Sequence, residues 1–183
     1  MTWTTIARLD AGDQLTSTIW NNQVKGNLEH LYSVPRCWAY KTSAQSTSTS
    51  TGAYTNVTFD AEHYDTASIH DTVTNNERFT LVRAGLWLVV GCVAFASNST
   101  GERLLRMVQY DSGGSAVETV SEDRDEAAGS SSPTYLTSVG LAYTDTTTDY
   151  VTMQSRQNSG GNLNVNSGTQ VTTVAVAWLG ELF

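Results

Sequence analysis

The stretch that decides the fold reads Arg78-Phe-Thr-Leu-Val-Arg-Ala-Gly-Leu-Trp-Leu-Val-Val-Gly-Cys-Val-Ala-Phe-Ala-Ser-Asn98. Its centre, residues 86–96, contains no charged residue. Successive side chains of a strand point to opposite faces, and here both faces are apolar. One face carries Leu86, Leu88, Val90, Cys92 and Ala94, and the other carries Trp87, Val89, Val93 and Phe95. The run is too short for a membrane span and too rich in Val and aromatic residues for a typical helix. It therefore predicts a strand that is buried on both faces.

Composition restricts the class of protein. The 183 residues carry a net charge of −8, and such a chain without a basic patch is a poor nucleic-acid binder, because phosphate contacts need Lys and Arg. No segment has the length and apolarity of a membrane span, and residues 1–10 lack the basic start and apolar run of a signal peptide. Charged residues make up only 15%, while Ser and Thr supply much of the polarity, which favours strands and loops. We expect one all-β domain with its own core, no nucleic-acid partner and no membrane insertion.

Residues 1–34 differ in pattern from the rest of the chain. Residues 1–15 form a short arm whose apolar points are Trp3, Ile6 and Leu9. Beyond it, apolar residues recur at helical spacing in Trp20, Val24, Leu28 and Leu31. This stripe predicts an amphipathic helix that Thr16 or Ser17 caps and that ends before Pro35. A helix this short is marginal alone, so its stripe packs either on its own domain or on a docking partner.

From residue 37 onward, short strands alternate with turn signals, which is the pattern of a β-sandwich. We predict strands at residues 37–42, 55–59, 79–82, 86–96, 104–110, 135–143, 149–157, 163–165 and 171–179. Val117 and Val120 indicate a short edge strand. We expect polar loops at residues 42–52, 60–72 and 122–133.

Two of these strands, 86–96 and 171–179, are apolar on both faces. One face of each can fill the sandwich core, but the other would leave an exposed apolar patch unless a second copy covers it. Burial of one such side chain is worth about 1.5–3 kcal/mol. We therefore expect an interface between copies of the chain that contains Leu86, Leu88, Val90, Val174, Val176 and Trp178.

Several motifs resemble those of the complement C1q and tumour necrosis factor jelly-roll superfamily. The first half matches in Val57-Thr-Phe-Asp60, in Tyr64-Asp-Thr66 and in residues 78–91. The second half matches in Asp149-Tyr-Val-Thr-Met153 and in residues 174–182, although Thr148-Asp149 replaces the usual Gly-Asp. The resemblance covers residues 37–183. It implies an all-β, C1q/TNF-like jelly-roll sandwich that forms a homotrimer with its inner-sheet strands on the three-fold axis.

A narrower resemblance concerns bacteriophage proteins. The segments Tyr64-Asp-Thr-Ala-Ser-Ile-His-Asp71 and Asn98-Ser-Thr-Gly-Glu-Arg103 resemble C1q-like domains of phage virion proteins. Residues 9–31 are similar to the segment that opens many phage tail and head-surface proteins, although Ser17-Thr18 replaces the usual small pair. The resemblance implies an attachment arm and helix at 1–34 and a knob at 37–183. The attachment contacts would come from Trp3, Ile6, Leu9, Trp20, Val24, Leu28 and Leu31.

Residue clusters that could carry chemistry are few. The group His63, Asp65, His70 and Asp71 matches no metal-ligand signature, and turn-forming Asp residues account for it better. The acidic residues between 118 and 126 could gather around calcium, but the intervening Arg124 and the missing EF-hand pattern favour a solvated loop. The two cysteines, Cys37 and Cys92, can be bridged or free. Since no nucleophile motif is present, we expect no cofactor, no bound metal and no enzymatic activity.

The sequence therefore predicts a homotrimeric phage virion structural protein on the particle surface, made in the host cytoplasm. It would be a capsid decoration or head-fibre protein or a minor tail protein, and its partners would be its own copies and other capsid or tail proteins. The alternative is a receptor-binding knob that adheres to a host-surface glycan or protein, and the two roles can coexist. A secreted cellular C1q-like protein fits less well, because signal peptide and collagen repeat are missing.

Overall fold

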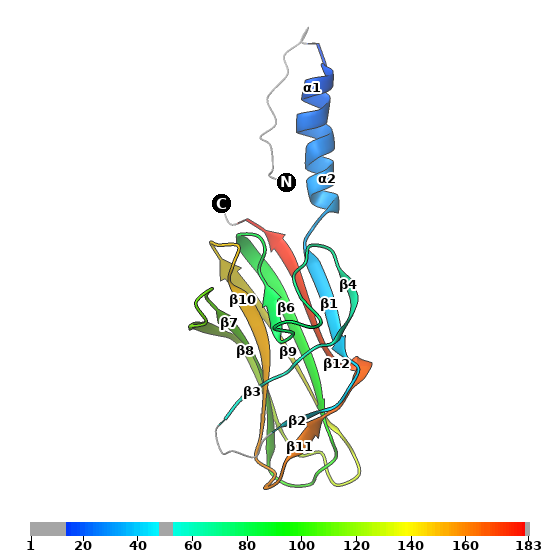
Figure 1. The fold of residues 1–183 in the computed structure, drawn as a ribbon, viewed down its shortest axis with the longest axis vertical. Helices are drawn as coiled ribbons and strands as arrows, with labels where there is room; N and C mark the ends of the chain where they lie inside the picture. The colour runs from blue at the N-terminus through cyan, green and yellow to red at the C-terminus, as the bar shows by residue number, and fades with distance from the viewer. Residues whose placement is uncertain (1–13, 48–52, 182–183) are drawn as a thin grey trace. The chain divides into compact units, whose positions relative to one another are not determined.

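A computed structural model describes residues 14–47 and 53–181 (Figure 1). The chain divides into two units, Met1–Val34 and Pro35–Phe183. The first unit contains a helical stretch composed of α1 (Ser17–Ile19), the π-helical segment η1 (Trp20–Lys25) and α2 (Gly26–Tyr32). The second contains the strands β1 (Arg36–Lys41), β2 (Gln45–Thr47), β3 (Thr55–Asn56), β4 (Ala61–Asp65), β5 (Arg78–Thr80), β6 (Gly85–Phe95), β7 (Glu102–Tyr110), β8 (Ala116–Glu126), β9 (Thr134–Thr144), β10 (Tyr150–Gln157), β11 (Leu163–Val165) and β12 (Gly168–Gly180).

The helical stretch begins at Ser17, directly after its N-cap residue Thr16. The hydroxyl of Thr16 accepts a hydrogen bond from the backbone N–H of Ile19 at 3.2 Å, which satisfies one of the free donors of the first turn. The helix ends at Tyr32, before the Ser33-Val34-Pro35 sequence, because the residue before a proline disfavours helical geometry. The predicted helix is thus confirmed. Among the described residues, no helix combines the length and the apolarity that a membrane crossing would need.

The predicted attachment residues are only partly described. Trp20 and Leu28 are exposed and Val24 is half-buried. Trp3, Ile6, Leu9 and the side chain of Leu31 lie outside the described residues. Attachment through this segment remains a prediction.

The second unit is a sandwich of two antiparallel sheets (Figure 1). The seven-stranded sheet has the order β2-β11-β6-β12-β1-β4, and β9 pairs with β6. The five-stranded sheet has the order β3-β10-β7-β8, and β5 pairs with β10. The predicted all-β jelly roll is confirmed. Its core contains large apolar side chains that are almost completely buried, among them Trp87, Val89, Phe95, Leu105, Met107, Val151 and Met153.

The long strand β6 is apolar on both faces for two different reasons. Trp87, Val89 and Val93 face the opposite sheet and are fully buried. Between them Gly91 leaves room for the sulfur atoms of two core methionines, since a Cβ added there would lie 2.6 Å from Met107 Sδ. The other parity of β6 points away from the core. It forms the surface described in the next subsection.

One prediction about β12 is wrong. Val174, Val176 and Trp178 were expected at an interface between copies, but they are 0%, 2% and 8% exposed within one chain. They fill the sandwich core, and the alternate residues Ala175, Ala177 and Leu179 point outward. Both parities of this strand are apolar, so the pattern alone could not assign the faces.

Three predicted loops contain strands. The 122–133 segment was expected to be an acidic loop, yet β8 continues through it to Glu126 along the edge of the five-stranded sheet. Similarly, β4 lies in the polar 60–72 segment and β2 lies in the 42–52 segment. These strands lack an apolar alternation because they bury little, so their sequences resemble loops.

Candidate functional site

The candidate surface for self-association is the side of the seven-stranded sheet that does not face the core. It is formed mainly by β9, β6 and β12, neighbouring strands in which no residue is charged. We call it the outward face and define it by Tyr135, Val139, Leu141, Tyr143, Leu86, Leu88, Val90, Cys92, Ala175, Ala177 and Leu179. Leu141, Leu179 and Val139 are 52%, 54% and 57% exposed in the single chain. Exposed apolar patches of this kind are typical of interaction surfaces, which makes this face a candidate for one.

The strand register aligns these side chains in rows. Leu88 lies opposite Leu141 of β9 on one side and opposite Ala177 of β12 on the other. Residues directly opposite in an antiparallel pair project from the same face, so the row is continuous across three strands. The next row continues into β1 and consists of Val139, Val90, Ala175 and Trp38. The predicted interface residues Leu86, Leu88 and Val90 therefore lie on the outward face, and their contact with another copy remains a prediction.

An aromatic cluster borders the outward face at β1 and β4. The ring of His63 lies 4.1 Å from that of Trp38 and 4.7 Å from that of Tyr40. Its Nε2 atom lies 3.1 Å from the carbonyl oxygen of Thr169. His63 is thus a surface residue of the seven-stranded sheet. It does not join His70, with which it was grouped in the sequence.

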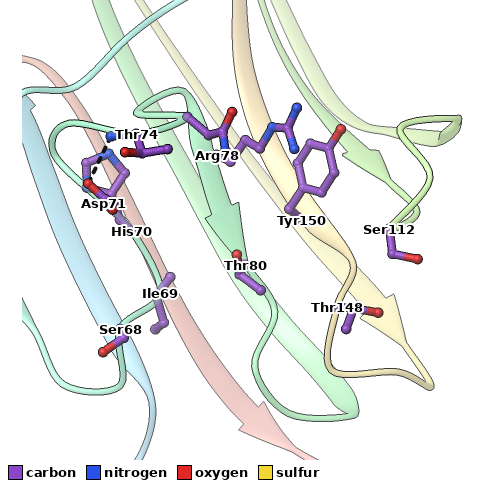
Figure 2. A pocket seen from close by; sticks show the side chains of 11 residues that line it. Ser68, Ile69, His70, Asp71, Thr74, Arg78, Thr80, Ser112, Thr148 and Tyr150 are labelled. Atoms are coloured by element: carbon purple, nitrogen blue, oxygen red, sulfur yellow. Dashed lines mark hydrogen bonds between the residues drawn. The ribbon is translucent and has the colours of Figure 1, made fainter.

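A polar pocket of about 520 Å³ lies elsewhere on the second unit, lined by residues of the 66–77 loop, β5, the β7–β8 hairpin, the turn before β10 and the start of β10 (Figure 2). Its lining includes side chains to which no hydrogen bond within the described residues can be assigned: Ser68, Thr74, Asn75, Thr80, Ser112 and Thr148. No lining residue belongs to the outward face as defined above. The pocket therefore has polar side chains that can hydrogen-bond to a ligand, and it is separate from the apolar outward face.

The guanidinium of Arg78 is fixed at one wall of the pocket. Its Nε donates to Glu77 Oε1 at 3.2 Å, and its Cζ lies 4.6 Å from the ring centroid of Tyr150 (Figure 2). Tyr150 is in turn stacked on Tyr110 at 5.3 Å. Among the described residues, no hydrogen bond is assigned to the two Nη atoms of Arg78. Glu77 thus holds the guanidinium through Nε, and the two Nη groups are left to donate to an acceptor on a ligand.

The 66–77 loop is anchored by a buried histidine. The side chain of His70 is fully buried and stacks on Phe79 at 4.7 Å. Its Nδ1 lies 2.8 Å from Glu62 Oε1, and its Nε2 lies 3.1 Å from the carbonyl oxygen of Asn76. Both ring nitrogens therefore lie within hydrogen-bonding distance of an oxygen atom. These contacts and the stacking on Phe79 fix the loop against the core.

Asp71 shapes the pocket side of the same loop. Its Oδ1 accepts hydrogen bonds from the backbone N–H groups of Val73 at 2.8 Å and Thr74 at 3.0 Å. The N–H groups of Thr74 and Val73 lower the pKa of Asp71 below its ordinary value, so the carboxylate is ionised at neutral pH. Ser68 and Asn75, which also line the pocket, have positive φ angles of 55° and 51°. No other non-glycine residue of the described chain has one, and such strained backbone is common at binding sites.

The remaining predicted cluster residues have structural partners. Asp65 accepts the backbone N–H groups of Ala67 and His70, each at 2.9 Å, as expected for a turn-forming aspartate. The carboxylates of Asp65 and Glu62 lie with the Cys37 thiol in a group whose ligand atoms are within 4.8 Å of one another. Burial, together with the charges of Asp65 and Glu62, raises the pKa of the Cys37 thiol. The thiol is therefore protonated at neutral pH, which makes it a poor metal ligand as it stands.

The two cysteines lie on opposite faces of the seven-stranded sheet and are both free thiols. Cys37 is completely buried in the core, whereas Cys92 is half-buried on the outward face. Of the two open alternatives, the structure has the unbridged one. Cys92 is therefore a natural probe of the outward face.

Sequence reasoning singled out His70 and Asp71 but missed Arg78, Thr80 and Thr148 as pocket residues. The pocket combines segments separated by up to about half the chain, and each contributes only one or two polar side chains. The one local signal was a Glu-Arg pair directly before a predicted strand, which is common on protein surfaces.

Comparison with known proteins identifies the fold. No protein-family model and no curated protein matches the sequence. Among solved structures, murine APRIL at pH 5.0 is similar with a TM-score of 0.61 and 13% sequence identity, over 80% of this chain and 99% of that chain. Eiger TNF from S. frugiperda is similar with a TM-score of 0.55 and 13% identity, over 82% of this chain and 94% of that chain. The second unit is therefore a TNF-like jelly roll, and at this identity the likeness concerns the fold alone.

Proposed function

We propose that this TNF-like jelly roll assembles as a homotrimer and serves as a structural protein on the surface of a bacteriophage particle. The observation that carries the proposal is the outward face. Its three main strands contain no charged residue, and its largest side chains are about half exposed in one chain. Burial of this surface between copies removes the cost of leaving it in water. The resemblance to the C1q and TNF superfamily supports three copies around one axis.

The virion role rests on the resemblance of residues 9–31 and of the 64–71 and 98–103 segments to phage proteins. In this proposal residues 1–34 attach the trimer to the capsid or tail, and the jelly roll projects as a knob. Capsid decoration, head fibre and minor tail protein are all compatible with such an arrangement.

Deletion of residues 1–34 tests the attachment. The second unit has its own sheets and core, so the shortened chain should fold and assemble but fail to join particles in a complementation assay. The full chain with Val73→Asp, a change at an exposed loop residue, is the matched control and should be incorporated normally. Incorporation of the shortened chain at the level of the full chain would contradict the proposal.

A second candidate function is adhesion to a host surface, either in addition to the structural role or in place of it. The observation that favours it is the polar pocket beside Arg78, which no part of the outward face covers. Binding of the purified trimer to host cells would support adhesion. A trimer that decorates every capsomer yet binds no host cell would contradict it.

A further inference from the structure

The pocket beside Arg78 contains both kinds of hydrogen-bonding group in high density. Arg78 supplies fixed donors, Asp71 supplies a charged acceptor, and other residues of the lining carry hydroxyl groups that serve as either (Figure 2). The hydroxyl-bearing residues are Ser68, Thr74, Thr80, Ser112 and Thr148. A ligand with several neighbouring hydroxyl groups matches this lining, because each of its hydroxyls both donates and accepts.

The charges around the pocket select against an acidic ligand. Arg78 is the cation of the lining, but Glu77 lies 3.2 Å from its Nε. The carboxylate of Asp71 lines the same cavity. A carboxylate or phosphate group on the ligand would therefore enter a cavity that Asp71 also lines, where Glu77 already offsets part of the charge of Arg78. A neutral ligand avoids this repulsion.

The volume of the pocket suits one sugar unit. Its lining offers no open apolar wall against which a hydrocarbon could pack. About 520 Å³ falls within the range of roughly 300–1,000 Å³ that is usual for small-molecule sites. Tyr150 is only 7% exposed, because Tyr110 and Arg78 pack against its ring. Recognition here depends on hydrogen bonds and not on an open aromatic platform.

The pocket is also preorganised. His70 anchors the 66–77 loop in the core, and Asp71 fixes the following turn through two backbone N–H groups. The strained residues Ser68 and Asn75 both line the cavity. Side chains that are already held in position lose less conformational freedom when a ligand binds.

We propose that the pocket formed by the 66–77 loop, Arg78, Thr80, Ser112 and Thr148 binds a neutral saccharide unit. This inference names the ligand class for the adhesion function proposed above and rests on that function. Arg78 donates to adjacent sugar hydroxyls through its Nη edge, and Asp71 accepts from another hydroxyl through Oδ2. No lining residue of the pocket belongs to the outward face.

Saturation-transfer NMR on the full-length protein tests the ligand class. The neutral probes are the methyl glycosides of glucose, galactose, mannose and N-acetylglucosamine, and the acidic probes are glucuronic acid and N-acetylneuraminic acid, all at millimolar concentration. We expect transfer to at least one neutral glycoside and none to the acidic sugars. Absence of transfer to every neutral probe, or transfer only to the acidic sugars, would overturn the proposal.

Three variants assign the binding to this pocket. Arg78→Gln removes the guanidinium and should weaken the best neutral glycoside at least tenfold, since it removes charged donors from the site. Thr148→Val replaces one exposed hydroxyl by a methyl group and should weaken it about two- to tenfold, the effect of one hydrogen bond. Thr119→Val makes the same change on exposed β8, outside the pocket, and should leave the affinity unchanged. Equal affinities in the wild type and in Thr148→Val and Arg78→Gln would refute the assignment.

Light scattering on the same samples separates this inference from the proposed assembly. A trimer that binds no neutral sugar would refute the saccharide site and leave the assembly in place. A monomer that binds sugar in a Thr148-dependent manner would support the site and refute the assembly.

Discussion

Replacement of Leu141 by Asp should abolish assembly and leave the fold intact. Leu141 lies next to Leu88 at the β9 end of a row on the outward face and is 52% exposed in the single chain. A carboxylate at this position is therefore solvated in the monomer and adds little strain there. In an assembled trimer the same carboxylate would be buried against apolar side chains of a neighbouring copy.

The magnitude follows from burial. About half of the Leu141 side chain is left to bury, so its loss costs about 1 kcal/mol per copy, half of the roughly 1.5–3 kcal/mol for a whole side chain. Burial of an unpaired polar group adds about 2 kcal/mol or more. Three copies give about 9 kcal/mol, which at about 1.4 kcal/mol per tenfold change weakens the trimer by about six powers of ten.

Sedimentation velocity at micromolar concentration measures this effect, and thermal unfolding followed by circular dichroism reports the fold. Val73→Asp introduces the same charge at an 84% exposed valine in the 66–77 loop and should sediment like the wild type. A Leu141→Asp protein that sediments like the wild type would refute the location of the interface. A Leu141→Asp protein that fails to fold would refute the claim that this face is exposed in the monomer.

Further predictions concern the core and the two cysteines. Val176→Asp places a charge at a 2% exposed core position and should cost more than about 4 kcal/mol, so its circular dichroism should lack a cooperative unfolding transition, in contrast to Leu141→Asp. Burial raises the pKa of the Cys37 thiol. Above about pH 9 the unfolded chain loses the thiol proton, whereas the folded protein keeps it. The free energy of unfolding should therefore fall as the pH rises further, by up to about 1.4 kcal/mol per pH unit. Urea unfolding on both sides of that pH should show this loss in the wild type and a smaller one in Cys37→Ala. Cys92 should react with a maleimide in Leu141→Asp but not in the wild-type trimer, while Cys37 stays unreactive in both; rapid Cys92 labelling in a protein of trimer mass would place it outside the interface.

The features that sequence predicts well are those with a local cause. The strand β6 is predicted because its uninterrupted apolar run is rich in Val and aromatic residues and carries large side chains in both parities. The cover of its outward face by another copy stays a prediction. The capped helix is likewise encoded locally by Thr16 and Pro35. The short motifs around Phe59, Tyr64 and Phe79 indicated the jelly roll through their resemblance to the C1q and tumour necrosis factor superfamily.

The features that sequence misses depend on three-dimensional context. In β12 both parities consist of Val, Ala, Leu and Trp, so only the packed sandwich decides that Val176 points inward and Ala177 outward. The edge strand β8 buries few side chains, and its acidic end has the composition of a loop. The polar pocket arises where the 66–77 loop, a hairpin and a turn converge, and no single segment among them carries a recognisable motif.

Light scattering after gel filtration measures the mass of the purified full-length protein in solution and so reports whether it is a trimer. With a chain mass of 19.8 kDa, we expect a particle of three times that mass and Cys92 thiols that resist labelling. A particle with the mass of one chain and freely reactive Cys92 would contradict this expectation, because the uncharged outward face would then be stable in water without a second copy.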